Sequence, residues 1–367
     1  VMVQLPSSGA VAIYNQLGAV DIIADAVGYF SVPDIDVIPP DPTTTAPAND
    51  PTEPTDLAEQ TKFLYSGPNP VQTFVSPGAI DPERSTVIRG RVRTRDGGAL
   101  AGVRVTAPDH PELGRTVTRN DGAFDFVVNG GTAAALQYQK SGFLPVQRHA
   151  PASEGELTTV DDVVLIPLDT TSTVVAGNSG TVQSAQSSAV TDSDGTRHNT
   201  LVFPAGTTAK MRMPDGSLQD LGAMTVRATE YTVGDDGPNA MPGELPPNSG
   251  YTYAVELSVD EALAAGATSV EFNQPVADYV ENFVGFPVGM KVPSGTYDRS
   301  SSQWTATPNG VVVKIVSITA GRADLDVSGD GAADSGSALS TLGINDAERT
   351  KLATLFTTGT SLVRVPI

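Results

Sequence analysis

The sequence predicts a mainly β protein made of tandem antiparallel β-sandwich domains, with only a few short helices. Runs such as NTLVFPAG, TVRATEYTV and YTYAVELSV alternate β-branched or aromatic residues with polar ones, as strands with one buried face do. Pro-Asp-Gly, Pro-Ala-Gly and Pro-Ser-Gly separate these runs and mark turns. The 36 glycines and 28 prolines supply the many turns that an all-β chain requires.

Length and composition fit an exported protein of several domains. With 367 residues, of which 39% are hydrophobic, the chain can form two or three domains with cores of their own. The net charge of -20 argues against nucleic acid binding, and the absence of cysteine removes disulfides and thiol chemistry. No apolar run reaches the roughly eighteen residues of a membrane span, and no signal peptide is visible. We expect a secreted or cell-surface protein whose export signal lies upstream of Val1.

Two segments precede the first complete domain. Residues 1–32 contain three alternating runs, and their motif DAVGYF, Asp25–Phe30, resembles the last strands of a repeat in actinobacterial cell-surface proteins. Residues 33–58 are rich in proline, threonine and acidic residues and contain few apolar ones. Because such a segment cannot bury enough surface to offset the entropy of ordering it, we predict an extended linker between extracellular domains.

Residues 59–170 are predicted to form a compact β-sandwich preceded by a short lead-in. Turn sequences at 96–98 and 120–122 separate predicted strands, of which there are about seven in all. The motifs RGRV, GALAGVRV, NDGAFDF and KSGF resemble the carboxypeptidase regulatory-like, transthyretin-type sandwich. This resemblance implies a non-catalytic domain.

The rest of the chain is predicted to form a second, larger β region and a C-terminal piece. Residues 171–320 carry further alternating runs, and residues 321–367 contain an acidic loop followed by a helix.

Two helices interrupt the predicted strands. The first covers Val259–Ala265, where Ser258 is placed to cap the helix and Glu261 to complete a capping box. The second covers residues 345–356, with Asn345 as its cap.

Residues from about 60 to 367 resemble the N-terminal region of bacterial YD-repeat (Rhs-type) and teneurin-like proteins. The segments that carry this resemblance include FLYSGPNPVQ, HPELGRT, NDGAFDFVVNGG, GYTYAVELSVDEA and VPSGTYDR. In such proteins a regulatory-like domain precedes a β-rich plug, and a large YD-repeat shell follows. The resemblance implies a scaffold that caps or plugs the downstream shell, which encloses a toxin or presents an adhesive surface. The expected partners are that shell of the same full-length chain and, outside it, a cell-surface protein or glycan.

The acidic loop is the strongest candidate for a metal site. Calcium prefers several oxygen ligands, and carboxylates on alternate residues with a glycine at the turn can supply them. Ser337 and Ala333 depart from the usual calcium-loop pattern, and a solvated acidic loop is the alternative. We predict a structural calcium site with ligands from Asp324, Asp326, Ser328, Asp330, Ala332 and Asp334.

The sequence offers little that could catalyse a reaction. His110, His149 and His198 lack the paired spacing of zinc ligands, and Asp192 and Ser193 near His198 lack a nucleophile elbow. The acidic turn at residues 192–195 is better explained by a hairpin than by a cation. The candidate glycosidase carboxylates have no distinguishing pattern; they are Glu256, Glu261 and Glu271.

We therefore predict that the chain is not an enzyme. The alternative to a scaffold is a glycan-binding module of a surface carbohydrate-processing protein. That alternative rests on the regulatory-like domain and on Trp304, and it predicts exposed aromatic residues along a groove. The scaffold hypothesis instead predicts aromatic residues that are buried between sheets or that face a missing partner.

Overall fold

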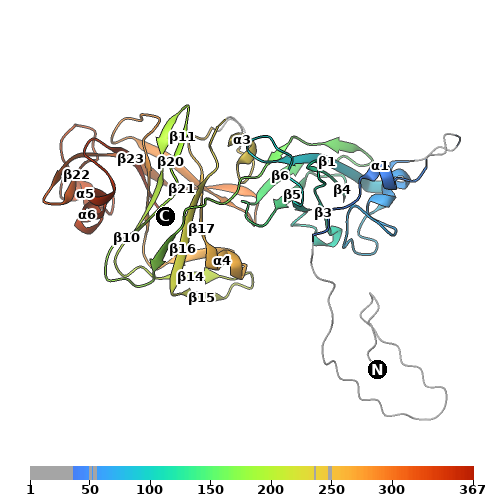
Figure 1. Ribbon diagram of the computed structural model, residues 1–367, viewed down its shortest axis with the longest axis horizontal. Helices are drawn as coiled ribbons and strands as arrows, with labels where there is room; N and C mark the ends of the chain where they lie inside the picture. Colours follow the sequence, from blue (N-terminus) through green and yellow to red (C-terminus); the bar gives the residue numbers. More distant parts are fainter. Residues whose placement is uncertain (1–35, 49–51, 53–55, 235–236, 247–249) are drawn as a thin grey trace, which may run out of the picture. The chain divides into compact units, whose positions relative to one another are not determined.

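The computed structural model describes residues 36–48, 52, 56–234, 237–246 and 250–367 (Figure 1). The strands predicted for residues 1–32, including the motif at Asp25–Phe30, lie outside the described residues. The described chain is mainly β, with several antiparallel sheets and a few short helices, so the predicted fold class is confirmed. None of the described helices is long and apolar enough to cross a membrane.

Short helices lead into the first sandwich. Their bounds are Pro42–Thr45 (α1), Leu57–Thr61 (α2), Lys62–Leu64 (η1) and Pro82–Arg84 (η2). Helix α1 lies in the segment whose composition predicts an extended linker. It forms because Asp41 accepts a hydrogen bond from the Thr43 backbone N–H at 2.9 Å, and because a proline at the first helical position sacrifices no helical hydrogen bond.

Two four-stranded sheets form the first sandwich. One contains β1 (Ser85–Arg93), β4 (Ala123–Asn129), β7 (Leu157–Thr159) and β8 (Val163–Val164). The other contains β2 (Arg104–Thr106), β3 (Arg115–Val117), β5 (Ala134–Gln139) and β6 (Val146–Ala150), and the 3₁₀ turn η3 (Pro111–Leu113) precedes β3. β7 and β8 pair with β1 in parallel, whereas the other pairs are antiparallel.

The core of the first sandwich fills the space between its two sheets. Ile88 on β1 and Phe124 on β4 are fully buried with Tyr138 on β5. The rings of Phe124 and Tyr138 meet edge to face, with their centroids 5.5 Å apart. The lead-in joins this core, because the buried Gln72 side chain donates to the carbonyl of Val127 at 3.0 Å and accepts from its N–H at 2.6 Å.

A seven-stranded antiparallel sheet organises the second β region. Its main path runs β10-β13-β19-β23-β21-β20, and β22 pairs with β21. The strands are β10 (Gln183–Gln186), β13 (Asn199–Phe203), β19 (Ala277–Glu281), β20 (Lys291–Asp298), β21 (Gln303–Thr319), β22 (Arg322–Asp326) and β23 (Ser361–Pro366). Because β22 and β23 belong to this sheet, the domain boundary that the sequence suggests at residue 320 falls within a single sheet.

Smaller sheets pack beside the large one. The first has the order β17-β16-β9, the second has the order β15-β14-β18, and β11 and β12 form a hairpin. Their strands are β9 (Thr173–Ala176), β11 (Val190–Asp192), β12 (Gly195–Arg197), β14 (Ala209–Arg212), β15 (Leu218–Leu221), β16 (Ala223–Glu230), β17 (Val255–Val259) and β18 (Ser269–Phe272).

The two helices predicted for the second region lie at the predicted positions, but one of them has a different N-cap residue. Helix α6 (Asp346–Leu355) begins as predicted, since Asn345 accepts from the Glu348 N–H at 2.9 Å. Helix α4 (Asp260–Ala265) also exists, but the predicted Ser258 cap is wrong because Val259 occupies the cap position and Ser258 belongs to β17. Two further helices were not predicted, α3 (Gly237–Ala240) and α5 (Ser337–Thr341).

The two faces of the large sheet have different surroundings. Ala277 and Tyr279 on β19 join a core that includes Leu339 of α5 and Leu352 of α6. Side chains alternate along a strand, so Asp278 and Val280 of the same strand point to the opposite face. There, Val280 belongs to a small cluster that no helix covers in the described part of the chain.

The first sandwich and the second β region form one compact unit, residues 36–367. Arg148 on β6 donates to the carbonyls of Asn239 and Met241 at 2.7 and 2.9 Å. A shared apolar cluster connects the two parts, with Leu144 and Ile166 on one side and Tyr231, Ala240 and Met241 on the other. Figure 1 shows α3 beside the strands of the first sandwich, where these contacts form.

Replacing Gly114 with alanine should destabilise the first sandwich. Gly114 has φ = +68°, and an added Cβ would lie 2.1 Å from the Thr73 carbonyl oxygen. That backbone cannot retreat freely, because Thr73 and Arg115 exchange two hydrogen bonds. We expect a loss of about 2–4 kcal/mol in the free energy of unfolding, measured by urea titration.

Gly222→Ala is the matched control. Gly222 has no positive φ and no atom within 4 Å of an added Cβ, so its replacement should change stability by less than about 1 kcal/mol. Equal stabilities of the two variants would contradict the close backbone approach at Gly114.

Candidate functional site

The predicted calcium loop follows β22, and Asp326 is the residue around which it turns. The Asp326 carboxylate is 2% exposed and accepts three backbone hydrogen bonds, from the N–H groups of Ser328, Gly329 and Gly331, at 3.1, 2.6 and 2.9 Å. A carboxylate offers about four lone-pair positions. The loop backbone therefore uses most of the oxygen capacity that a cation would need.

Asp334 and Asp330 also bind the loop backbone. Asp334 accepts from the N–H groups of Val327 and Ser328 at 2.8 and 2.9 Å, and the Val327 bond is the main reason that its pKa lies below the usual value. Asp330 accepts from the Ala332 N–H at 2.9 Å. The structure thus brings Asp326 and Asp334 onto the same short backbone segment.

Asp324 precedes Asp326 by two residues on β22 and has different partners. The hydroxyls of Thr319 and Ser317 donate to one of its oxygens, and Arg349 pairs with the other at 2.9 Å. Those hydroxyls, and then the arginine, lower the pKa of Asp324. Among the residues that the structure describes, no three acidic or histidine side chains gather as ligands of one metal ion.

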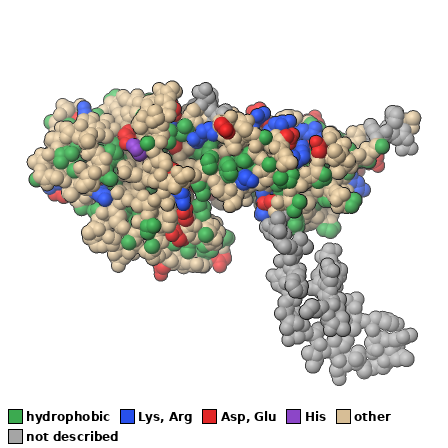
Figure 2. All heavy atoms as spheres, in the orientation of Figure 1, with side chains coloured by type: hydrophobic (Ala, Val, Ile, Leu, Met, Phe, Trp, Pro, Cys, Tyr) green, Lys and Arg blue, Asp and Glu red, His purple; other side chains and the backbone are tan. Residues whose placement is uncertain are grey.

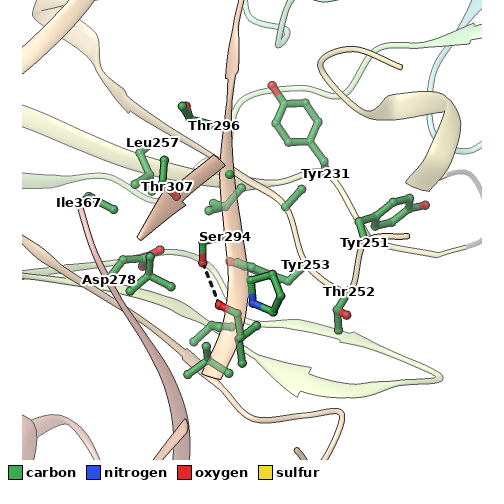
Figure 3. A pocket seen from close by; sticks show the side chains of 18 of the residues that line it. Tyr231, Tyr251, Thr252, Tyr253, Leu257, Asp278, Ser294, Thr296, Thr307 and Ile367 are labelled. Atoms are coloured by element: carbon green, nitrogen blue, oxygen red, sulfur yellow. Dashed lines mark hydrogen bonds between the residues drawn. The ribbon is translucent and has the colours of Figure 1, made fainter. Parts of the chain in front are cut away.

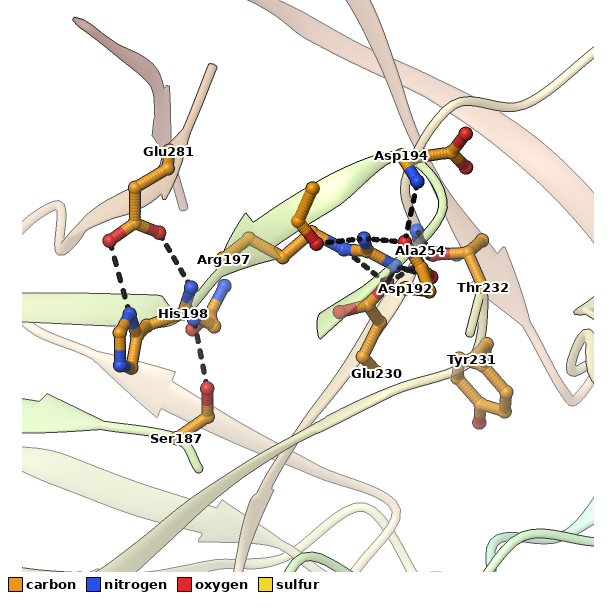
Figure 4. A network of polar contacts seen from close by, with 12 residues as sticks. Ser187, Asp192, Asp194, Arg197, His198, Glu230, Tyr231, Thr232, Ala254 and Glu281 are labelled. Carbon is orange, nitrogen blue, oxygen red and sulfur yellow. Dashed lines mark hydrogen bonds and ion pairs between the residues drawn. The ribbon is translucent and has the colours of Figure 1, made fainter. Parts of the chain in front are cut away.

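The histidines are paired with glutamates instead of with one another. His198 meets Glu281 twice, through its Nδ1 at 3.1 Å and through its backbone N–H at 2.5 Å (Figure 4). Asp192, which a hydrolytic triad would require beside His198, pairs with Arg197. His110 and His149 lie near glutamates 112 and 244, respectively. Asp192 and His198 therefore do not form the acid–histidine pair of a catalytic triad.

Arg197 forms a buried ionic network that sequence reasoning missed. Its side chain is 1% exposed and lies between Asp192 and Glu230, with contacts of 2.8 and 2.5 Å (Figure 4). The guanidinium also lies 4.3 Å from the centre of the Phe283 ring. Hydrogen bonds from Arg197 hold the pKa of Asp192 well below its usual range. The hairpin β11–β12 explains the acidic turn at 192–195, as predicted.

The three candidate glycosidase carboxylates are each engaged in separate contacts. Their partners are Arg299 and Tyr231 for Glu256, Thr225 for Glu261, and Arg212 for Glu271.

Arginines on the outer face of β1 are neutralised by aspartates. Figure 2 shows basic and acidic side chains next to each other over this sandwich. Their pairing leaves no extended positive surface on β1. The ion pairs are Arg89–Asp125, Arg91–Asp121 and Arg93–Asp162.

A cavity of about 1000 Å³ lies against the face of the large sheet opposite α5 and α6 (Figure 3). β17 and β20, which are edge strands of two different sheets, form parts of its wall. Val284 and Met290 on its rim are 49% and 42% exposed, so the cavity opens to solvent.

Aromatic side chains line much of this cavity. Trp304 is half-buried, its indole N–H donates to the Glu244 carbonyl at 3.1 Å, and its ring lies 5.3 Å from that of Tyr297. Tyr251 and Tyr253 line the cavity as well (Figure 3). Sequence reasoning singled out Trp304 alone and did not predict that these rings share one cavity.

Asp278 places a buried carboxyl group in this cavity wall. The residue is 8% exposed, and its Oδ1 accepts a hydrogen bond from the Asn199 side chain at 2.7 Å. Burial raises the pKa of Asp278 to about 7, although hydrogen bonds from Asn199 and the Tyr279 backbone partly oppose that shift. Within the described part of the chain, no arginine, lysine or histidine forms an ion pair with it.

The transthyretin-type prediction is confirmed for part of the first sandwich. Residues 80–165 match the family described as the teneurin TTR-like domain. Similar proteins include Teneurin-m of Drosophila melanogaster, 40% identical over 107 residues, and Teneurin-3 of Danio rerio, 35% identical over 109 residues. Each match covers 29% of this chain and 4% of the relative's length, so the chain spans only a small part of these proteins.

Likeness to solved structures is weak. The 3-chlorocatechol 1,2-dioxygenase of Rhodococcus opacus 1CP is 13% identical, with 23% of this chain and 61% of that chain covered, at a TM-score of 0.18. This similarity is too weak to indicate a function.

The titration of Asp278 should make the protein less stable as the pH rises towards 7. Its pKa is raised in the folded state to about 7 from 3.8, so the protonated carboxyl favours folding, and this contribution is lost as the pH passes through 7. Relative to Asp278→Asn, the native chain should lose roughly 3 kcal/mol of stability between pH 5 and pH 8, since each pH unit between 5 and the folded-state pKa contributes about 1.4 kcal/mol. Urea unfolding at both pH values measures this difference.

Thr307→Val provides the control, because Thr307 lines the same cavity and does not titrate. Its stability relative to the native chain should be the same at pH 5 and pH 8. If the Asp278→Asn difference is equally independent of pH, the carboxyl is not in the environment described.

Proposed function

We propose that this chain is a non-catalytic structural region of a secreted or cell-surface YD-repeat protein, and that it caps or plugs a downstream β-shell. The observation that carries the proposal is the match of residues 80–165 to the teneurin TTR-like domain. In the full-length protein, the shell would enclose a toxin or present an adhesive surface.

The junction between the two β parts supports a scaffold role. A scaffold must hold neighbouring domains in fixed relative positions, which requires specific contacts between them. Here Arg148 donates to two backbone carbonyls of the second region, and the Tyr297 hydroxyl donates to Gln147 at 2.9 Å. Buried apolar side chains reinforce these polar contacts.

The proposal predicts a stable complex with the YD-repeat region of the same gene. Expressed as separate polypeptides, the two should co-elute in size-exclusion chromatography with 1:1 stoichiometry, because a plug must bury a large surface in its shell. Binding measured by calorimetry should have a Kd of about 1 μM or tighter. An unrelated β-sandwich with a similar negative charge controls for non-specific attraction.

Two folded polypeptides that do not associate would contradict the plug proposal. The aromatic lining of the cavity supports the alternative, a glycan-binding module. That alternative would gain if a glycan array detected binding that Trp304→Ala removes and Trp304→Phe, which keeps an aromatic ring, retains.

We also propose that the loop from Asp324 to Asp334 binds calcium as a structural ion. Support comes from the carboxylates of Asp326 and Asp334, which converge on the loop backbone, and from Oδ2 of Asp326, which accepts only one of the three backbone bonds. The ion would fix the loop before α5 and α6.

Calcium should raise the melting temperature relative to EDTA. A hundredfold excess over Kd stabilises the folded state by about 2.7 kcal/mol, which corresponds to a rise of about 3–4 °C for a chain of this size. Asp330→Asn should remove the rise, whereas Asp215→Asn, at an exposed turn elsewhere, should keep it. Equal melting temperatures in EDTA and millimolar calcium would exclude a structural site.

A further inference from the structure

The cavity beside β17 and β20 has the size and lining of a ligand site. Its volume of about 1000 Å³ lies at the upper end of the range for small-molecule pockets, which are mostly apolar with a few fixed polar groups. Ser294 on β20 and Asp278 on β19 lie around the same part of the cavity (Figure 3). This arrangement offers an apolar volume with a buried carboxyl group at its wall.

Asp278 differs from the other buried acids of the described chain in its partners. Asp125, Glu230 and Glu348 are each paired with an arginine, at 2.5–2.9 Å. Asp326 has three backbone N–H donors instead. Asp278 is also buried, but its side-chain partner is the neutral amide of Asn199. The other acids are held by an arginine or by several N–H donors. A carboxylate in that position lacks the counter-charge that normally compensates its burial.

The other charged groups around the cavity do not supply this counter-charge. Among the described residues, those that line the cavity and carry charge are Glu256, Asp278, Glu281 and Arg299. Arg299 pairs with Glu256 at 2.8 Å and donates to the Tyr231 hydroxyl, so it is committed elsewhere. Glu281 is occupied by His198. The charged lining is therefore acidic overall, with Asp278 as its uncompensated member.

Aromatic rings in the cavity wall also favour a positively charged ligand. The faces of aromatic rings attract cations, and the attraction is strongest where water is excluded. Tyr253 lies near Asp278, since the Asp278 charge adds to burial in raising the pKa of the Tyr253 hydroxyl. Tyr251, Tyr297 and Trp304 contribute further rings to the walls. An ammonium group at Asp278 would thus have an apolar and aromatic space for the body to which it is attached.

We propose that this cavity binds an organic cation: an amine with an apolar body, whose ammonium group pairs with the Asp278 carboxylate. The apolar body lies against the aromatic and aliphatic walls. This site does not depend on the scaffold function, since every group that forms it belongs to the described chain.

The test compares two probes of nearly equal shape, 4-phenylbutylamine and 4-phenylbutan-1-ol. Isothermal titration calorimetry with the full chain at pH 8, where the Asp278 carboxyl is ionised, should show the amine binding at least tenfold more tightly than the alcohol. In Asp278→Asn this preference should fall below threefold. Asp215→Asn, which changes an exposed acid in the turn between β14 and β15, should keep the full preference.

A second variant locates the site independently of Asp278. Ser294→Phe places a large ring into the cavity from β20 and should abolish binding of both probes, even if Asp278→Asn does not fold. Equal affinities of amine and alcohol for the native chain would overturn the proposal, as would the absence of amine binding at millimolar concentration. A preference for the amine that persists in Asp278→Asn, or binding that persists in Ser294→Phe, would overturn it as well.

Discussion

The alternation of side chains along β19 determines which residues face the helix-covered core and which face the cavity. Tyr279 points to the helix side, where its hydroxyl meets Glu348 of α6 at 2.5 Å and Arg364 of β23 at 3.1 Å. Its neighbour Asp278 must point the other way, into the cavity. A slip of one residue would place an unpaired carboxyl in the helix-covered core and a tyrosine in the cavity, so one register fixes both environments.

The two faces also show two ways in which the fold manages buried charge. On the helix side Glu348 and Arg364 are both nearly inaccessible, and they compensate each other at 2.9 Å. Arg197, the last residue of β12, likewise compensates two acids, Asp192 and Glu230. On the cavity side no such pair forms around Asp278. The buried acids on the helix side and beside the hairpin are thus compensated by arginines, whereas Asp278 lies in the wall of a cavity that opens to solvent.

Local patterns were sufficient to predict the strands and two of the helices. Alternation and turn residues in the first sandwich predict its strands, and Asn345 followed by Glu348 predicts the start of α6. Helix α1 was missed because composition outweighed a good cap at Asp41. The Ser258 cap failed because β17 continues through that residue, so pairing with β16 overrode the local preference.

The site was much harder to predict, since its parts are distant in sequence. Asp278 is one acid within the apolar run PVADYV, and this unusual position was the only local signal. Nothing local indicates that Asn199 donates to it across 79 positions or that Trp304 shares its cavity. In contrast, the acidic loop was conspicuous because its carboxylates are contiguous, yet the structure commits many of their oxygens to local backbone.

The central place of β23 has a consequence for biosynthesis. Leu362 pairs with Glu281 on one side and with Val313 on the other, so the strand joins segments made long before it. A ribosome must therefore release the chain through Pro366 before the middle of this sheet can close. Until then β19 and β21 present unpaired edges, which are surfaces prone to mispairing with other strands.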